Sequence, residues 1–329
     1  MILDVAHGSS SLLVSGSSSA VFDAAPKDVL MQALAQYEIS KIDYLFLSHL
    51  DQDHVGGVIN ILGSKKVNVA NLIINADPTK TGATNEELLT SIEDAVINKG
   101  LKIHRAYYPS SPMVVGETEI KILAPSVFDS LRGSGGQDKE GNKIDSNSSS
   151  IVLKLHHQGH PIAVFMGDID QRALDSLAAS KQDLSSDVLL FPHHGGHCST
   201  DNSTFTKQLV GLVKPKVTIF SMGRKRHKNP RKEIVEAVKE AAPNTYIACT
   251  QLSKNCLKDL PKERDNWAVH LANLPGAGRK DTHSCHGALH LHLNGNNTQY
   301  PAVNGPHNQF IQLNIPLALC QQPHSDSAS

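Results

Sequence analysis

Short apolar runs alternate with amphipathic segments along most of the chain, and the two patterns predict strands and helices in turn. The apolar runs predict strands at residues 1–5, 11–14, 20–22, 44–47, 69–74, 101–106, 151–155, 162–165, 187–192, 216–221 and 246–250. Apolar residues at helical spacing predict helices at residues 28–38, 84–99, 171–179 and 231–241. Strands and helices that alternate in this way are typical of layered α/β folds.

Two polar stretches interrupt the alternation. Residues 128–149 are rich in Gly, Ser and Asp and have little to bury, so they predict a mobile loop. From residue 295 onward the chain is rich in Asn, Gln, Pro and Ser. Within this part, residues 310–319 predict one last strand, and residues 321–329 predict disorder.

The densest group of chemically active side chains follows the apolar run at residues 44–47. His49, Asp51, Asp53 and His54 come directly after it, and two glycines and a further apolar run follow them. Imidazole and carboxylate groups are the ligands that Zn, Mn or Fe prefer in proteins. A loop at the end of a strand aims several such ligands at one point, so this segment predicts a metal site.

The segment S-H-L-D-Q-D-H-V-G-G resembles the H-x-H/D-x-D-H motif of the metallo-β-lactamase superfamily. Its form is similar to that of the branch that contains the C-terminal domain of the competence protein ComEC. The resemblance implies an α/β fold, a four-layered α/β/β/α sandwich with a metal centre between its two sheets. It implies a single hydrolase domain over residues 1–295 with an insert at 251–285, followed by a C-terminal extension at 296–329.

The start of the chain also resembles this branch, in which D-V-G-x-G-(D/N) leads into a strand and then to (I/V)-D-x-G. In this chain Ala6 replaces the first glycine and Ala25 replaces the later one. Asp23 matches the aspartate of that motif, which implies a supporting role beneath the loop that carries the ligands. His7 either faces the site or lies on the surface.

Downstream motifs supply the other ligands that the resemblance implies. Asp168 follows an apolar strand in a Gly-Asp pair, and the family uses this aspartate to bridge two metals. His193 and His194 match the family's P-H-H-G, so that one of them completes the second metal position and the other lies beside the substrate. Adjacent side chains on an extended segment point in opposite directions, and the sequence leaves open which one is the ligand. Asn147 occupies a position near which many relatives place a metal-binding His, and we count it with Asp53 and His194 as a candidate catalytic residue.

One concentrated basic segment, residues 224–228, follows a predicted strand. Arg224, Lys225, Arg226 and His227 are candidates for contact with a substrate phosphate, and a solvated run of charge is the alternative. The formal net charge of the whole chain is −1, so no global basic field favours nucleic acid. Tight binding of DNA by this chain alone is therefore not expected, and a partner protein is one way to deliver it.

Three cysteines and a histidine lie in or beside the predicted insert. Cys249, Cys256, His283 and Cys285 are candidate ligands of an additional structural zinc, although their spacing is not that of a standard zinc knuckle. Buried or free thiols are the alternative interpretation. The chain has five cysteines, far apart in sequence, which does not indicate a disulfide framework.

Composition limits the location that we expect. No apolar run reaches the roughly 18 residues of a membrane span, and the first residues lack the basic-then-apolar pattern of a signal peptide. We therefore expect a cytoplasmic protein with no membrane contact. The oligomeric state and the metal used in the cell stay open.

The resemblance and the ligand set together predict a hydrolase that uses two divalent metal ions, Zn or Mn, to generate a hydroxide nucleophile. Asp51 in place of the histidine of the lactamase type makes the site more oxygen-rich, which favours phosphoryl substrates. The first hypothesis is a phosphodiesterase, with DNA favoured because the ComEC resemblance implies nuclease activity. Hydrolysis of a small phosphodiester or other ester is the second. A metal-binding regulatory subunit with a vestigial site is the third.

Overall fold

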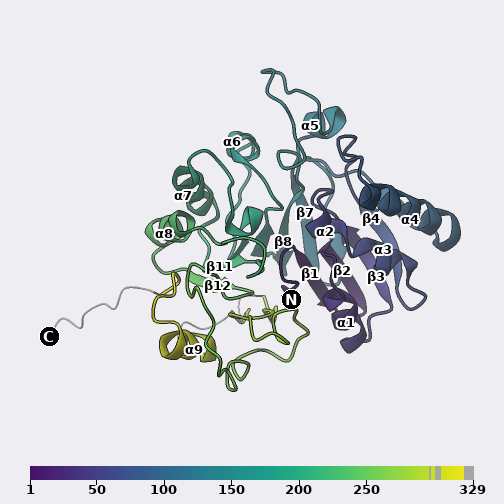
Figure 1. Ribbon diagram of the computed structural model, residues 1–329. Coiled ribbons are helices and arrows are strands. Elements are labelled where there is room, and N and C mark those ends of the chain that lie inside the picture. Colours follow the sequence, from purple (N-terminus) through teal and green to yellow (C-terminus); the bar gives the residue numbers. More distant parts are fainter. Residues whose placement is uncertain (296–297, 301–304, 322–329) are drawn as a thin grey trace.

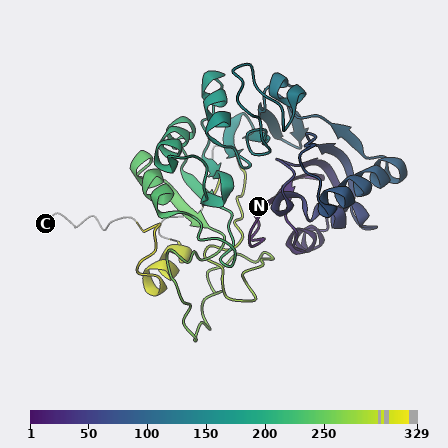
Figure 2. The same ribbon diagram turned by 45° about the horizontal axis from the view of Figure 1, so that its top comes forward.

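Two β-sheets face one another, and helices cover the outer face of each. The computed structural model describes residues 1–295, 298–300 and 305–321. Figure 1 shows the helices of the N-terminal half on one side of the paired sheets and those of the following part on the other. Figure 2, turned towards the top of the molecule, shows the same separation of the two helical layers.

The first sheet has the strand order β1-β2-β3-β4-β5. Only β1 and β2 are antiparallel, and β2 to β5 run parallel to one another. Its strands are β1 (Ser10–Ser15), β2 (Ser18–Ala24), β3 (Lys41–Phe46), β4 (Asn68–Ile73) and β5 (Lys102–His104). Its helices are α1 (Val29–Gln36), α2 (Gln52–Val55), α3 (Val58–Gly63) and α4 (Ala83–Lys99). The parallel strands bring their carboxyl ends, and the loops that follow them, to one edge.

The second sheet has the order β12-β11-β10-β9-β8-β7-β6. β6 to β9 form antiparallel pairs, and β9 to β12 run parallel. Its strands are β6 (Met113–Val115), β7 (Thr118–Ala124), β8 (Val152–His157), β9 (His160–Phe165), β10 (Val188–Leu190), β11 (Val217–Phe220) and β12 (Tyr246–Cys249). The helices of this part are α5 (Val127–Arg132), α6 (Gln171–Ala179), the 3-10 turn η1 (Pro192–Gly195), α7 (Asn202–Val213), α8 (Lys232–Ala241) and α9 (Pro306–Asn314).

Alternation along the strands explains the layers. Successive side chains of a strand point to opposite faces, so an apolar run buried on both faces feeds two cores. In β2, Phe22 enters the core between the sheets, and its neighbour Val21 enters the core beneath α1, α3 and α4. In β9, Phe165 lies between the sheets, where its ring stacks on that of Phe22 at 4.7 Å, while Val164 lies beneath α6, α7 and α8. The four-layered sandwich predicted from the sequence is confirmed.

The polar segment 128–149 is only partly a loop. Its first residues belong to α5, and the Ser126 side chain accepts a hydrogen bond from the Asp129 N–H at the start of that helix. Arg172 on α6 holds the segment at two points, through Nη2 to Asp129 Oδ1 at 2.9 Å and through Nε to Asp138 Oδ2 at 3.0 Å. The segment is therefore tied to the helical layer, contrary to the free loop that its composition predicts.

The C-terminal part departs furthest from the sequence-based expectation. The insert at 251–285 contains no helix or strand and crosses the lower part of Figure 1 as connected turns. The strand predicted at 310–319 is wrong, because the first half of this segment, residues 310–314, belongs to α9, which buries Phe310 and Ile311 against the core of the second helical layer. The disorder predicted for 321–329 falls, beyond Gln321, outside the described residues, as do 296–297 and 301–304. The boundary at 295/296 stays a prediction.

Within the described residues, no helix is long and apolar enough to cross a membrane.

Candidate metal centre

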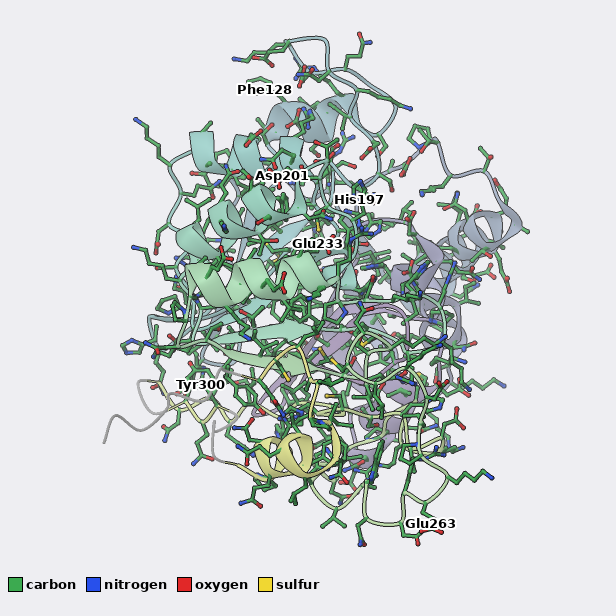
Figure 3. The ribbon with its side chains drawn as sticks, turned by 60° about the vertical axis from the view of Figure 1, so that its left-hand side comes forward. Phe128, His197, Asp201, Glu233, Glu263 and Tyr300 are labelled. Atoms are coloured by element: carbon green, nitrogen blue, oxygen red, sulfur yellow. The ribbon has the colours of Figure 1, made fainter. Side chains whose placement is uncertain are left out.

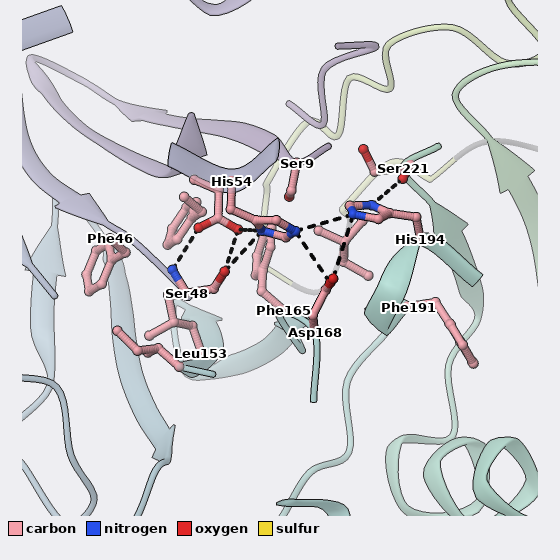
Figure 4. Close-up of a pocket in the computed structure, with 15 residues that line it drawn as sticks. Ser9, Phe46, Ser48, His54, Leu153, Phe165, Asp168, Phe191, His194 and Ser221 are labelled. Carbon is pink, nitrogen blue, oxygen red and sulfur yellow. Dashed lines mark hydrogen bonds and ion pairs between the residues drawn. The ribbon is translucent and has the colours of Figure 1, made fainter. Parts of the chain in front are cut away.

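Histidine and aspartate side chains from both sheets converge at the edge where the parallel strands end. Figure 4 shows His54 and Asp168 at the centre of this pocket, with His194 on one side of them; Phe46 and Phe165 also line the pocket. The aromatic rings close the pocket on the side of the core between the sheets. The chemically active groups therefore lie at the rim of the sandwich rather than inside it.

The ligand loop leaves β3 and turns at once into the one-turn helix α2. Asp51 occupies the N-cap position, and Asp53 and His54 lie on the turn itself. Gly57 follows because the backbone is in close contact with the end of β2: a Cβ atom at this position would lie 2.4 Å from the Ala25 carbonyl oxygen. The Gly-Gly that ends the sequence motif thus allows α2 to press against β2.

Asp23 holds the ligand loop from below. Its Oδ1 accepts a hydrogen bond from the Ser48 N–H at 2.7 Å, and its Oδ2 accepts one from the Ser48 hydroxyl at 2.9 Å. The same Oδ2 lies 2.8 Å from His54 Nδ1. A carboxylate accepts only, so His54 Nδ1 donates and its Nε2 is directed towards the centre of the site. This is the arrangement that a supporting aspartate requires.

A left-handed turn in η1 sets the direction of the paired histidines. His193 has φ 50° and His194 has φ 56°, a region that residues other than glycine seldom adopt. The segment is therefore not extended, and the two side chains do not point in opposite directions as the sequence argument assumed. Both approach Asp168 Oδ2, His193 through Nδ1 at 3.4 Å and His194 through Nε2 at 3.8 Å.

His194 is the more deeply placed of the two. Its Nδ1 donates to the Ser221 carbonyl oxygen at 2.7 Å, which directs Nε2 inward. That atom lies 3.3 Å from Asp53 Oδ2 and 3.3 Å from His54 Nε2. His193 is placed at the edge of this set: its ring Nδ1 and its backbone N–H both contact the carboxylate of Asp168. The geometry therefore favours His194 as the ligand and leaves His193 at the edge.

Two groups of side chains have the proximity that a metal ion needs. In the described part of the chain, His49, His54 and Asp168 have ligand atoms within 4.8 Å of one another, and so do His7, Asp53 and His194. The groups adjoin at the close contact between His54 and His194. Two adjoining groups of mixed imidazole and carboxylate fit two divalent ions.

The protonation of the histidines supports this fit. His54 and His194 each use Nδ1–H to donate to an oxygen acceptor, so in their neutral forms both Nε2 atoms carry lone pairs. Two lone pairs 3.3 Å apart repel unless a positive charge lies between them. His49 Nε2 is also buried with no hydrogen-bond partner. The residues present therefore fit the metal ions that the family implies.

The electrostatics of the ligand side chains also indicate a need for positive charge at this point. Burial lowers the pKa of His54, but the carboxylates of Asp168 and Asp23 outweigh it and raise that pKa well above its ordinary value. Burial raises the pKa of Asp53, yet hydrogen bonds from His194 and His7 hold it well below its usual range. Both carboxylates around His54 thus favour a cation at this point, whether a proton or a metal ion.

Asp51 lies further out than the other predicted ligands. Its Oδ2 is 3.7 Å from His49 Nε2, and its Oδ1 contacts Lys80 Nζ. The nearby imidazole of His49 and the charge of Lys80 lower the pKa of Asp51 to about 2, despite partial burial. The Oδ1 atom of Asn147 is buried and has no hydrogen-bond partner among the described residues.

The basic segment divides into a buried and an exposed part. Arg224, predicted to contact a phosphate, is buried and donates to the carbonyl oxygens of Leu252, Leu257 and Lys258. Its guanidinium anchors the insert, and that prediction is wrong. Lys225 is exposed and pairs with Asp281 Oδ2 at 2.7 Å.

The tip of this segment reaches the site. Arg226 and His227 are exposed, and the ring of His227 lies 4.7 Å from that of His7. Of the four side chains predicted to contact a phosphate, these two therefore remain available for a substrate.

The candidate zinc ligands do not form a group. In the parts of the chain that are described, neither of the two ligand groups contains a cysteine. His283 Nδ1 lies 3.8 Å from Asp281 Oδ2, whereas the Cys285 sulfur lies 3.4 Å from His307 Nε2. Cys249 and Cys285 are buried as free thiols, and burial raises the pKa of each well above its ordinary value. The set built on His283 is therefore not assembled.

Sequence reasoning left open or missed three contributors to the site. His7 was left open between the site and the surface, and it faces the site, where its Nε2 lies 3.0 Å from Asp53 Oδ2. Its signal was a histidine between a strand end and a glycine. Lys80 and the Ser221 carbonyl gave no signal, because nothing local marks a lysine or a main-chain oxygen that meets its partner through the fold.

Comparison with known proteins gives the class. Residues 3–95 match the family model of the metallo-beta-lactamase superfamily, which covers the ligand loop. These residues therefore resemble this superfamily, as their motifs predict. The two ligand groups are of the kind that a metal-dependent hydrolase of that class needs.

A curated relative matches over a longer stretch. The chain is 24% identical over 209 residues to ComE operon protein 3 of Bacillus subtilis (strain 168), a match that covers 63% of this chain and 24% of that protein. The chain thus spans about a quarter of the length of this relative.

Solved structures also resemble it. The metallo hydrolase Igni18 of Ignicoccus hospitalis is 14% identical, with a TM-score of 0.45 over 75% of this chain and 93% of that one. Tm1679, a metal-dependent hydrolase of the beta-lactamase superfamily, is 15% identical, with a TM-score of 0.44 over 74% and 88%.

Proposed function

We propose that this chain is a metal-dependent phosphodiesterase, with DNA as the favoured substrate. The observation that carries the proposal is the pair of adjoining ligand groups, which share the contact between His54 Nε2 and His194 Nε2 at 3.3 Å. Two adjacent divalent ions are the arrangement by which many enzymes clamp the attacking and leaving oxygens of a phosphodiester. The resemblance to the nuclease-like domain of ComEC supports DNA over other diesters.

The residues of the site have separate roles in the proposed reaction. Bound divalent ions would acidify a water molecule and offset the negative charge of the phosphate. Asp53 stays ionised at neutral pH, because His194 and His7 hold its pKa low, and its carboxylate is suited to orient the attacking water. Asp23 and the Ser221 carbonyl fix the rings of His54 and His194.

The exposed end of the basic segment supports an anionic substrate. Arg226 and His227 lie on the open side of the site, next to His7. Asn147, which ends the polar segment, remains a candidate catalytic group: its amide oxygen is unpaired, and Ser150, three residues on, accepts a hydrogen bond from the Asp168 N–H. The identity of the ions, Zn or Mn, and the cytoplasmic location stay predictions.

The test combines metal content with hydrolysis. Wild type and Asp168→Ala would be loaded with Zn²⁺ or Mn²⁺, dialysed, and measured by elemental analysis and for cleavage of linear DNA and bis-p-nitrophenyl phosphate. We expect two ions per wild-type chain, fewer in the variant, and cleavage only by the loaded wild type. A loaded wild type that cleaves neither substrate would overturn the proposal.

Salt dependence separates the two phosphodiester substrates. Binding of a polyanion falls steeply between about 50 and 200 mM salt, whereas binding of a small diester does not. DNA cleavage that declines over this range, while cleavage of the small diester persists, supports DNA as the substrate. Cleavage of the small diester alone, at every salt concentration, favours the small-molecule hydrolase. A partner that delivers DNA is part of the proposal, because the net charge of the chain is −1.

A further inference from the structure

The segment that carries His7 is held against the site from two sides. The Ser9 N–H donates to the Asp53 carbonyl oxygen at 3.1 Å, and the Ser221 hydroxyl donates to the Gly8 carbonyl oxygen at 2.8 Å. Gly223 lies so close that a Cβ there would be 2.3 Å from His7 N. His7 is thus fixed between the ligand loop of the first sheet and the end of β11 in the second.

Its imidazole meets two predicted ligands. His7 Nε2 lies 3.0 Å from Asp53 Oδ2, and the same oxygen lies 3.3 Å from His194 Nε2. The ring of His7 is 4.9 Å from that of His194. One carboxylate oxygen between two imidazoles, with all three ligand atoms within 4.8 Å of one another, has the proximity that ligands of one metal ion need.

We propose that His7 is a further metal ligand and forms, with Asp53 and His194, the outer cation position of the binuclear centre. The assignment rests on the metal dependence of the proposed function and adds to it a ligand that none of the motifs in the sequence marked. The donor set of two imidazoles and one carboxylate suits Zn²⁺ or Mn²⁺ and leaves a fourth position for water or a substrate oxygen.

The two ligand groups differ in access to solvent. The side chains of His49 and His54 are 2% and 1% exposed, while those of His7 and Asp53 are 15% and 18% exposed. The ring of His227, on the exposed tip of the basic segment, lies 4.7 Å from that of His7. His7 and Asp53 are therefore the side chains that a chelator, or a phosphate approaching past His227, would meet first.

The test compares two identical substitutions. His7→Gln removes the outer ligand, and His197→Gln changes an exposed histidine near the rim, labelled in Figure 3. Each protein would be dialysed against a series of free Zn²⁺ concentrations, and bound metal measured by elemental analysis. We expect two ions in wild type and in His197→Gln. In His7→Gln one ion stays tight and the second is weakened by at least about 10-fold, the scale on which ligand-shell changes act.

A second measurement uses the wild-type protein and so does not depend on the folding of a variant. Diethylpyrocarbonate modification of each histidine would be read by mass spectrometry with and without Zn²⁺. Zinc should protect His7 and leave His197 reactive. Two tight ions in His7→Gln, or equal modification of His7 in both states, would overturn the assignment while leaving a binuclear hydrolase intact. A wild type that binds no ion would overturn the proposed function as well.

Discussion

The Nε2 atoms of His54 and His194 face each other at 3.3 Å, although 140 positions separate the two residues in the chain. Each ring is turned by an oxygen on its far side, from Asp23 for His54 and from the Ser221 carbonyl for His194. The contact joins the two halves of the sandwich at the metal centre. Mutations of the groups that orient the two rings should therefore affect metal binding, as mutations of the ligands themselves should.

Replacing Asp23 by Asn should weaken metal binding without removing a ligand. An amide offers His54 Nδ1 and the Ser48 donors one acceptor oxygen where the carboxylate offers two, so the ring of His54 loses its fixed direction. Loss of such an outer partner typically costs 10–100-fold in metal affinity. Asp43→Asn is the matched control, because Asp43 lies near the start of β3, away from the ligand loop, and pairs with Lys41. Metal titration of both variants decides: equal affinities would remove the supporting role of Asp23.

Gly223→Ala should destabilise the protein, because the added methyl would meet the backbone of His7 and Ala6, at 2.3 and 2.7 Å. Overpacking of this kind typically costs about 1–3 kcal/mol. Gly211→Ala, in α7 with no heavy atom within 4 Å of the new Cβ, should instead gain about 0.5–1 kcal/mol from helix propensity. Urea unfolding of the two variants measures both effects. An unchanged free energy of unfolding in Gly223→Ala would show that the backbone around His7 shifts to make room for the methyl group.

The two arginines of the basic segment should behave in opposite ways. Arg224→Gln leaves three main-chain carbonyls of the insert without their charged donor and should cost about 3 kcal/mol of stability. Arg226→Gln, on the surface, should stay within about 0.5 kcal/mol of wild type but weaken the binding of an anionic substrate. Thermal unfolding and a KM measurement on each protein distinguish them. Loss of stability in Arg226→Gln would contradict the conclusion that Arg224, and not Arg226, holds the insert in place.

His286 should make stability depend on pH in the mildly acid range. Burial, together with the nearby His270, lowers the pKa of His286 from 6.5 to about 4. Between these two values the unfolded chain binds a proton that the folded chain does not, so the free energy of unfolding rises with pH over this window. Below about pH 4 the loss is complete and reaches at most about 3 kcal/mol. Urea unfolding of wild type and His286→Gln between pH 4.5 and 7.5 should show a shallower slope in the variant; parallel slopes would contradict the buried neutral ring.

Much of the fold could be predicted from local patterns in the sequence. Helix α6 begins and ends at the residues that its periodicity predicts, because its apolar stripe is complete and Asp170 caps it through a hydrogen bond from the Ala173 N–H. The ligands at 49–54 and Asp168 were found because they lie at the ends of apolar runs, where a parallel sheet gathers its loops. What failed depended on contacts distant in sequence. The segment at 310–319 has an apolar content that fits either state, and only the core that it covers makes it helical.

In the candidate site, too, features set by the local sequence could be predicted, and features set by distant contacts could not. The order of ligands along the chain could be predicted, whereas the direction of His193 and His194 could not, because it follows from a left-handed turn that no local residue type requires. Arg224 and its exposed neighbour Arg226 are alike in sequence. The burial that separates them is imposed by the insert, which folds back from further along the chain. Figure 3 shows Glu263 of that insert and Phe128 of α5 at opposite ends of the view, with the helical layer between them.

The buried carboxylate of Asp4 has a consequence for anyone who would shorten or graft this domain. It accepts hydrogen bonds from Gln251 Nε2, the Gly278 N–H and the Ser284 hydroxyl, all within or bordering the insert, and from the Ala6 N–H beside His7. Deleting the insert alone would remove three of the four hydrogen-bond donors of this carboxylate, three residues before His7. A minimal version of this domain should therefore replace Asp4 in the same step, and a transplanted insert needs an acceptor at that position to stay in place.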